Sequence, residues 1–430
     1  MDSSGTSSSV LSVKPTAGLA SLVIGVASYN HAATVGRVVR VVEEGLARCC
    51  PSREARIVLA DGGSTDGTVT AARNAVGDPS RLMEVTVSQP PTAPVSMPYH
   101  GMPGRPRALH AVLEVARDQQ AEACAIVDAG EQTIEPSWIE RLIGPVMRDE
   151  FDYVTPYYAR LPFDGAITKS IVYPMFRAVY GVGLRQPATG DFACSARLVR
   201  HYLDQDLWNG EGAEAGVDIW LAAAAVCGRF RICEAALGVR LSAQPEFAPD
   251  LSTTIAQVVG SMFVDLERYV DVWQRVRGSR SVPVVGNPQE AQPEAAAVSA
   301  DSLPDSLIDA FRLGYRELRD VWTWVLPPGS IVALRKVAEA PVDRFRLDDD
   351  LWARIVYDFA IGHRLRVLPH DHLLRSLTPL YAGWMASFIS QIRDRPGALV
   401  EGRVEHVCRA FEAEKPYLIS RWRWPERLRT

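Results

Sequence analysis

The most informative polar stretch of the chain is LADGGSTDGT, which runs from Leu59 to Thr68. Asp61 follows an apolar run there, and the two glycines after it allow the backbone to come close to a ligand. Ser64 and Asp66 are residue types that cap a following helix. A carboxylate in this position can accept hydrogen bonds from a nucleotide base or a ribose. Taken alone, Asp-Gly-Gly is more often a tight strand-to-helix turn, so the surrounding sequence has to decide.

Further polar residues follow apolar runs in the same part of the chain. Ser28 and Asn30 end the run LASLVIGVASYN, and Asp128 closes the apolar run in ACAIVDAG. Such continuous runs are typical of strands buried on both faces. Between the first run and the run that ends at Asp61, the apolar residues at 35–46 have the spacing of one face of a helix. This β-α-β order predicts a parallel sheet, whose ligands bind beyond the carboxyl ends of its strands. We therefore expect Asn30, Asp61 and Asp128 to converge.

The elements that must position these residues follow from the same periodicity. We expect strands within residues 19–30, 55–61, 82–89, 123–130 and 232–243, and helices within 32–49, 105–119, 251–276, 307–326, 348–365 and 371–392. Residues 277–306 are rich in Pro, Ala, Ser and Gly, which is typical of a linker or mobile loop. We predict a disordered tail at 1–18, an α/β domain at 19–276 and a mainly α-helical C-terminal domain at 307–430.

The composition argues against several classes of function. A formal net charge of -5 and the lack of a long basic run speak against a nucleic-acid partner. The seven cysteines have no CxxC spacing and are odd in number, so we expect neither a disulfide framework nor a zinc site. This use of cysteine predicts a cytoplasmic protein. The opening MDSSGTSSSV lacks the features of a signal peptide, and the apolar stretches are too short for a bilayer. We therefore expect no membrane span.

Several motifs, taken in order, resemble those of a known family. Asn30, the DGGSTDGT loop and Asp128 are similar to motifs of the GT-A glycosyltransferases. Three later motifs resemble the retaining mannosylglycerate, glucosylglycerate and glucosyl-3-phosphoglycerate synthases: GRPRAL at 104–109, QPATGDFA at 186–193 and GVDIWL at 216–221. Their ordered combination is specific where each motif alone is weak. The resemblance implies a Rossmann-like GT-A fold, with a mostly parallel sheet covered by helices on both faces.

The resemblance also implies roles for individual residues. The nucleotide sugar would be bound by Ser28, Asn30, Asp61, Ser64, Arg105 and Asp128, the acceptor by Thr189 and Gly190, and the catalytic residues would be Asp218 and Asp191. A metal ion, if one is used, would be bound by Asp128. These residue types suit the task, because a departing diphosphate needs cations or oriented dipoles and sugar hydroxyls need carboxylate acceptors.

Two expected metal-ligand positions depart from the pattern of the family. The usual Asp-x-Asp reads Asp128, an alanine and then Gly130, and a family histidine falls at Ser242. A hard cation such as Mg²⁺ or Mn²⁺ needs several ligands, so a lone carboxylate predicts a weak site unless Glu131 contributes. Arg105 stands where the family has lysine, and a permanently charged, bidentate arginine can partly replace the ion. The other candidate cations are Arg107, Arg185 and Arg240.

Two functions are compatible with these motifs. The first is a glycosyltransferase that moves a sugar, with retention, from a UDP- or GDP-linked donor to a small anionic acceptor similar to glycerate. The second is a catalytically inactive, metal-free homologue that regulates by binding a nucleotide or a protein. The presence of Asp61, Asp128, Gly190, Asp191 and Asp218 together favours the enzyme. A homodimer is left open.

Overall fold

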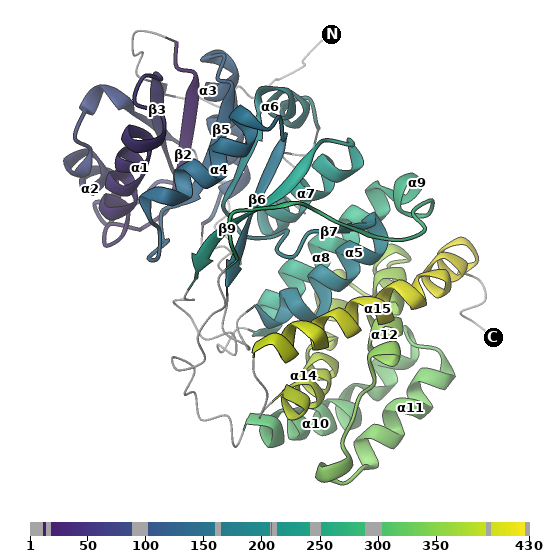
Figure 1. Ribbon diagram of the computed structural model, residues 1–430. Helices are drawn as coiled ribbons and strands as arrows, with labels where there is room; N and C mark the ends of the chain where they lie inside the picture. The colour runs from purple at the N-terminus through teal and green to yellow at the C-terminus, as the bar shows by residue number, and fades with distance from the viewer. Residues whose placement is uncertain are drawn as a thin grey trace, which may run out of the picture. The chain divides into compact units, whose positions relative to one another are not determined.

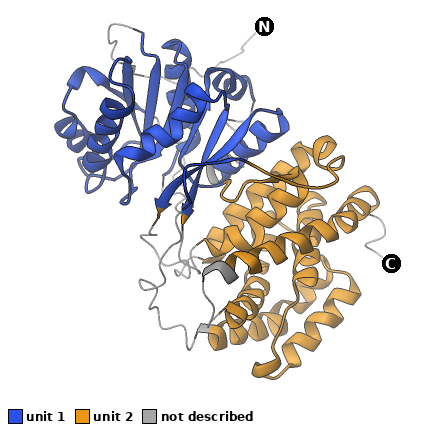
Figure 2. Cartoon of the chain, viewed as in Figure 1, with its two compact units in different colours: residues 1–158, 188–238, 283–288 blue, residues 159–187, 239–282, 289–430 orange. Residues whose placement is uncertain are grey.

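The computed structural model describes residues 12–13, 19–87, 102–159, 165–206, 208, 213–240, 251–288, 303–392 and 397–425. Contacts divide the chain into two compact units, coloured in Figure 2: unit 1 contains 1–158, 188–238 and 283–288, and unit 2 contains 159–187, 239–282 and 289–430. Unit 2 thus combines the C-terminal helices with 159–187 and 239–282, which the sequence analysis groups with the sheet. Periodicity identifies a helix but does not say which core it joins. Within the predicted linker, residues 289–302 lie outside the described part.

A nine-stranded sheet forms the centre of unit 1 in the described chain, with the order β1-β4-β3-β2-β5-β8-β6-β9-β11. The strands are β1 (Ser12–Val13), β2 (Leu22–Ser28), β3 (Ala55–Asp61), β4 (Leu82–Thr86), β5 (Ala123–Asp128), β6 (Tyr153–Ala159), β8 (Phe192–Ser195), β9 (Ile232–Val239) and β11 (Val284–Val285). Strands β2 to β5 are parallel, whereas β8 is antiparallel to β5 and to β6. The two residues of β1 come from the predicted tail and pair with β4.

Helices cover both faces of this sheet, as Figure 1 shows. The helices of unit 1 are α1 (Val35–Cys49), α2 (Thr68–Ala75), the 3₁₀ turn η1 (Pro79–Arg81), α3 (Arg105–Asp118), α4 (Pro136–Arg148), α6 (Ala196–Leu203) and α7 (Ala213–Cys227). Helices α1 and α4 pack together on one core cluster, and α3 packs with α6 and α7. Gly25 of β2 faces α3, because a β-carbon there would lie 2.5 Å from Cγ1 of Val112. The predicted α/β class is confirmed.

Unit 2 is mainly helical. It contains the π-helical turn η2 (Thr168–Val172), α5 (Tyr173–Tyr180), α8 (Leu251–Arg268), α9 (Val270–Trp273), α10 (Leu303–Thr323), α11 (Pro328–Glu339), the 3₁₀ turn η4 (Val342–Arg344), α12 (Asp349–Arg364), α13 (His370–Ser376), α14 (Thr378–Ile392), α15 (Gly397–Arg423) and a ladder of β7 (Val182–Gly183) with β10 (Arg280–Ser281). Helix α15 packs on α5 and α12. The predicted helical C-terminal region is confirmed. None of the described helices is long and apolar enough to cross a membrane.

Asp265 of α8 is a buried carboxylate without a full set of partners. Its Oδ1 lies 2.9 Å from Nη1 of Arg268, whereas its buried Oδ2 has no hydrogen-bond partner among the described residues. Burial raises the pKa of Asp265 to about 7, although the charge of Arg268 acts in the opposite direction. The ionised form is therefore unfavourable in the folded protein.

We expect Asp265→Asn to stabilise the protein increasingly as the pH rises. Because the folded-state pKa is raised, the stability that the protonated carboxyl contributes is complete below about pH 4 and is lost as the pH passes through about 7. Asparagine does not ionise, so the gain in free energy of unfolding should grow across this window and then level off. Denaturant unfolding at several pH values measures it, with the exposed Asp343→Asn as control. A gain that did not change with pH would contradict the raised pKa.

Candidate functional site

The register of the parallel strands aligns the polar ends of three of them. Ser28 pairs with Asp61 across β2 and β3, and Ala27 pairs with Asp128 across β2 and β5. Asn30 lies two residues after the end of β2 and forms hydrogen bonds with the loop after β3. The convergence that the sequence predicts at the carboxyl edge of the sheet is confirmed.

The carboxylate of Asp61 is held by its own loop. Its Oδ1 accepts from the hydroxyls of Ser28 at 2.9 Å and Ser64 at 2.6 Å. Its Oδ2 accepts from the backbone amides of Gly63 at 3.0 Å and Ser64 at 2.8 Å. These bonds fill about four acceptor positions, which is the capacity of a carboxylate. Asp61 therefore organises the turn, and a direct contact with a nucleotide stays a prediction.

Asn30 joins the loops that follow β2 and β3. Its backbone amide donates to Oγ of Ser64 at 2.8 Å, and its side-chain Oδ1 accepts from the backbone amide of Thr65 at 3.0 Å. The residue adopts φ of +55°, a conformation that asparagine tolerates better than most residues do. The two loops that the sequence assigns to nucleotide binding are thus fixed to each other.

Arg105 and Asp218 form a buried ion pair that the sequence does not predict. Arg105 begins α3, and Asp218 lies in α7 just after the non-helical Gly216. Nε and Nη2 of the guanidinium donate to Oδ2 and Oδ1 of Asp218, each at 3.1 Å, and Nη2 also donates to the carbonyl of Gly190 at 2.6 Å. The side chain of Arg105 is 1% exposed and that of Asp218 is 12% exposed. Two residues with separate predicted roles thus form one unit.

The charges around Arg105 keep it a cation. Burial lowers the pKa of this guanidinium, but Asp218, Asp128 and Asp191 act against it and the net pKa is raised. The planar fork of arginine suits this place, because it binds a carboxylate through two parallel bonds. The third nitrogen, Nη1, makes no hydrogen bond within the described chain. Any direct contact of Arg105 with a diphosphate would use that nitrogen.

Asp191 connects the loop before β8 to the end of β5. Its Oδ1 accepts from the backbone amide of Asp128 at 2.8 Å, and its Oδ2 accepts from the hydroxyl of Tyr158 at 2.7 Å. The hydroxyl of Thr189 donates to the carbonyl of Asp191 at 2.8 Å. Asp191 is 1% exposed. These contacts give Asp191 a positioning role toward Asp128, and its predicted catalytic role stays a prediction.

Gly190 occupies a place that does not suit a side chain. Its φ is +84°, and a β-carbon would lie 3.3 Å from Nη2 of Arg105 and 3.5 Å from Oδ2 of Asp128. We expect Gly190→Ala to lower the free energy of unfolding by about 1–2 kcal/mol, since an L-residue is strained in this conformation. Gly402→Ala is the control, because a β-carbon there meets nothing within 4 Å and a helical alanine should stabilise slightly. Equal denaturant midpoints for wild type and Gly190→Ala would contradict the assignment.

The described residues supply few ligands for a metal ion at Asp128. Oδ1 of Asp128 accepts from the amide of Gly130 at 2.8 Å, and Gly130 offers no ligand. Oε1 of Glu131 accepts from the amide and the hydroxyl of Thr133, at 2.8 Å and 2.6 Å. Within the described ranges no cluster of three or more His, Cys, Asp or Glu could hold a metal ion. Ser242, the other predicted departure, lies outside these ranges.

Two residues beside the site are not indicated by the sequence pattern. Tyr158 comes from β6, a strand that the periodicity does not reveal, and its hydroxyl reaches Asp191 only through the sheet. His31 follows Asn30 directly, and its ring lies next to Gly130. Its position next to Asn30, a predicted nucleotide-binding residue, is the sequence feature that could have indicated it. Of the other candidate cations, Arg107 is in unit 1, and Arg185 and Arg240 are in unit 2.

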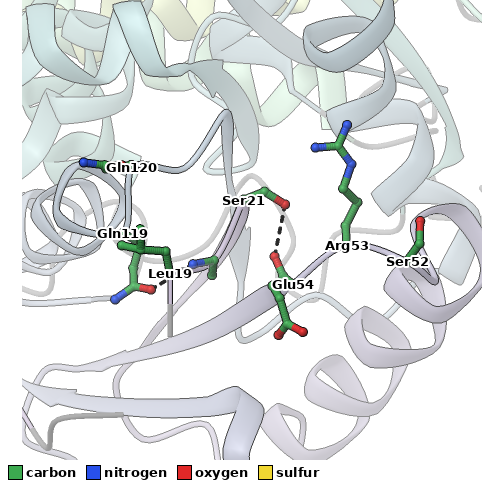
Figure 3. Close-up of a pocket in the computed structure, with 8 residues that line it drawn as sticks. Leu19, Ser21, Ser52, Arg53, Glu54, Gln119 and Gln120 are labelled. Atoms are coloured by element: carbon green, nitrogen blue, oxygen red, sulfur yellow. Dashed lines mark hydrogen bonds between the residues drawn. The ribbon is translucent and has the colours of Figure 1, made fainter. Parts of the chain in front are cut away.

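A surface hollow of about 300 Å³ lies at the opposite, amino-terminal end of these strands (Figure 3). It is lined by residues that precede β2 and β3 and by Gln119 and Gln120 after α3. The backbone amide of Ala20 donates to Gln119 at 3.0 Å, and the hydroxyl of Ser21 donates to the carbonyl of Glu54 at 3.2 Å. None of the predicted site residues contributes to this hollow, so we place the candidate site at the carboxyl edge.

Comparisons with known proteins give similarity in structure only. No family model matches the chain, and no curated protein matches it significantly. The structure is similar to glucosyl-3-phosphoglycerate synthase from Mycobacterium tuberculosis in complex with Mn²⁺, uridine diphosphate and glucosyl-3-phosphoglycerate, with 22% identity, a TM-score of 0.43 and coverage of 58% of this chain and 80% of that chain. The complex of that enzyme with Mn²⁺, UDP-glucose and phosphoglyceric acid is 20% identical, with a TM-score of 0.42 and coverage of 58% and 79%. Values this low do not transfer an activity.

Proposed function

We propose that the chain is a GT-A-type glycosyltransferase that moves a sugar, with retention, from a UDP- or GDP-linked donor to a small anionic acceptor similar to glycerate. The observation that carries this proposal is the gathering of Arg105, Gly190, Asp191 and Asp218 around Asp128 at the carboxyl edge of a parallel sheet. Sheets of this kind bind nucleotides at that edge. The ordered motifs that resemble the GT-A family add to it.

In this reaction the bond from the sugar carbon to the diphosphate oxygen breaks, and a bond to the acceptor oxygen forms on the same face. The acceptor proton passes to the departing diphosphate, so no base from the protein is required. Asp218, which is partly exposed, can accept a hydroxyl hydrogen bond and orient the sugar or the acceptor. Arg105 places a fixed positive charge beside the forming diphosphate. Gly190 lets the acceptor loop approach Arg105 and Asp128.

The second candidate, an inactive homologue with a binding role, is favoured by a different observation. The carboxylate of Asp61 is filled by donors of its own loop, and Arg105 is engaged by Asp218. These bonds stabilise the fold without any ligand. A protein that only binds a nucleotide or a partner protein would not need Asp61 and Arg105 to be free for a reaction.

Titration calorimetry with UDP, GDP, UDP-glucose and GDP-mannose separates the candidates, with Mn²⁺ and again with EDTA. The enzyme hypothesis predicts that either UDP and UDP-glucose or GDP and GDP-mannose bind. It also predicts that the sugar of that donor appears on glycerate or 3-phosphoglycerate in a product assay. Binding without transfer to any acceptor in the screen would favour the second candidate. If no nucleotide bound under either condition, the nucleotide-sugar site itself would be refuted.

A further inference from the structure

His31 lies at the place that the side chain of a second metal-binding carboxylate would enter. A β-carbon on Gly130 would be 3.0 Å from Nε2 of His31 and 3.2 Å from Oδ1 of Asp128. The ring of His31 therefore borders the space next to Asp128. It is half-buried in the loop between β2 and α1. Glycine at position 130 leaves room for it.

Hydrogen bonds fix both the backbone and the ring of His31. Its amide donates to the hydroxyl of Thr68 at 2.8 Å, and its carbonyl accepts from the amides of Thr34 at 3.0 Å and Val35 at 2.9 Å. The amide of Tyr29 donates to Nδ1 of the ring at 3.2 Å. The imidazole is thus held by the loop on one side and turns its other nitrogen toward Gly130.

The bond to Nδ1 determines what Nε2 can do. A ring nitrogen that accepts a hydrogen bond carries no proton, so in neutral His31 the proton is on Nε2. A protonated ring nitrogen has no lone pair for a metal ion, but it donates a hydrogen bond to an anion. Nε2 has no hydrogen-bond partner among the described residues. It is an open donor beside Asp128.

We propose that His31, through its Nε2–H, binds the diphosphate of the nucleotide and takes the place that a metal ion would otherwise hold; this rests on the proposed function. The site needs such a donor, because Asp218 engages two of the three guanidinium nitrogens of Arg105 and the described residues do not form a metal cluster. His31 is thus a binding residue specific for the phosphate groups. Binding of the diphosphate should then not require a divalent cation.

The first test is titration calorimetry with UDP, GDP and the matching monophosphates in the presence of EDTA. Whichever diphosphate binds the wild type should bind His31→Ala with about ten- to a hundredfold lower affinity, the usual effect of losing a hydrogen bond to a charged group. The preference for diphosphate over monophosphate should fall with it. His31→Gln, which keeps an N–H donor on a side chain of similar reach, should recover part of the loss. His372→Ala, at an exposed histidine of α13, is the matched control.

The outcomes separate this inference from the proposed function. If wild type binds neither diphosphate, either with Mn²⁺ or with EDTA, both fall. If wild type binds and His31→Ala binds equally well with EDTA, only the role of His31 is overturned. A wild-type affinity that requires Mn²⁺ would also overturn it. Thermal unfolding of each variant shows whether the fold is retained, and His31→Gln decides the matter if His31→Ala unfolds.

A second test uses the contact between His31 and Gly130. We expect Gly130→Asp alone to gain no Mn²⁺-dependent nucleotide binding, because its β-carbon would press on Nε2 of His31 at 3.0 Å. The double variant His31→Ala with Gly130→Asp has room for the carboxylate beside Asp128 and should gain it. Mn²⁺-dependent binding by Gly130→Asp alone would show that the imidazole does not occupy the place.

Discussion

Asparagine in place of Asp218 is expected to lower the turnover of sugar transfer by about a hundred- to a thousandfold, the usual effect of removing an oriented polar group from a reacting site. The amide has the shape of the carboxylate but not its charge. It can accept only one of the two bonds from Arg105, so both the cation and the bound hydroxyl lose their orientation. Steady-state kinetics with the donor identified by calorimetry would give kcat and KM separately.

Asparagine is a better probe at this position than alanine. Alanine would remove both hydrogen bonds that Asp218 accepts from the buried guanidinium of Arg105, and a loss of activity could then reflect unfolding. Asp118→Asn, at an exposed end of α3, serves as control and should keep full activity. Full activity of Asp218→Asn, with an unchanged KM, would refute the catalytic assignment.

Methionine in place of Arg105 is expected to lower the free energy of unfolding by about 3–5 kcal/mol and to abolish nucleotide binding. Methionine fills similar space but leaves three carboxylates, Asp128, Asp191 and Asp218, without their shared cation. Denaturant unfolding measures the first effect and calorimetry the second. A cycle with Asp218→Asn should show strong coupling, because the double variant removes both members of the pair.

Arg197 provides a matched control in the same unit. It pairs with Asp152, but its side chain is 62% exposed, and Asp152 also accepts from Ser195 and from the amide of Arg231. Arg197→Met should therefore cost at most about 1 kcal/mol, as exposed pairs do. If Arg105→Met cost no more than Arg197→Met, the ion pair with Asp218 would have no special importance for the fold.

The predictable part of the site is the part set by local pattern. Apolar runs place β2, β3 and β5, and the rule for parallel sheets brings Asn30, Asp61 and Asp128 to one edge. Arg105 and Asp218 are separated by 113 positions, and their pairing depends on how α3 and α7 pack on the sheet. No periodicity in either segment carries that information.

Short strands and short helices are the elements that the sequence pattern fails to predict. Strand β8 has four residues and lies antiparallel between β5 and β6, so its sequence has neither the length nor the alternation that would reveal it. Its position nevertheless sets Asp191 against Asp128. The periodicity predicts a single helix at 251–276 and another at 371–392. Both predictions are wrong, because the first segment breaks at Tyr269 and the second at Leu377. Pro379 in the first turn of α14 favours the second break.

The short distance between position 130 and the ring of His31 also restricts how such a sequence can evolve. A side chain at position 130 requires the ring of His31 to move by a few tenths of an ångström, so a new carboxylate there binds a cation only if the ring can move. A change at position 31 has to come earlier, and on its own it removes a donor from the anion. We therefore expect the two positions to be epistatic. Among natural relatives, histidine at 31 and glycine at 130 should be inherited together.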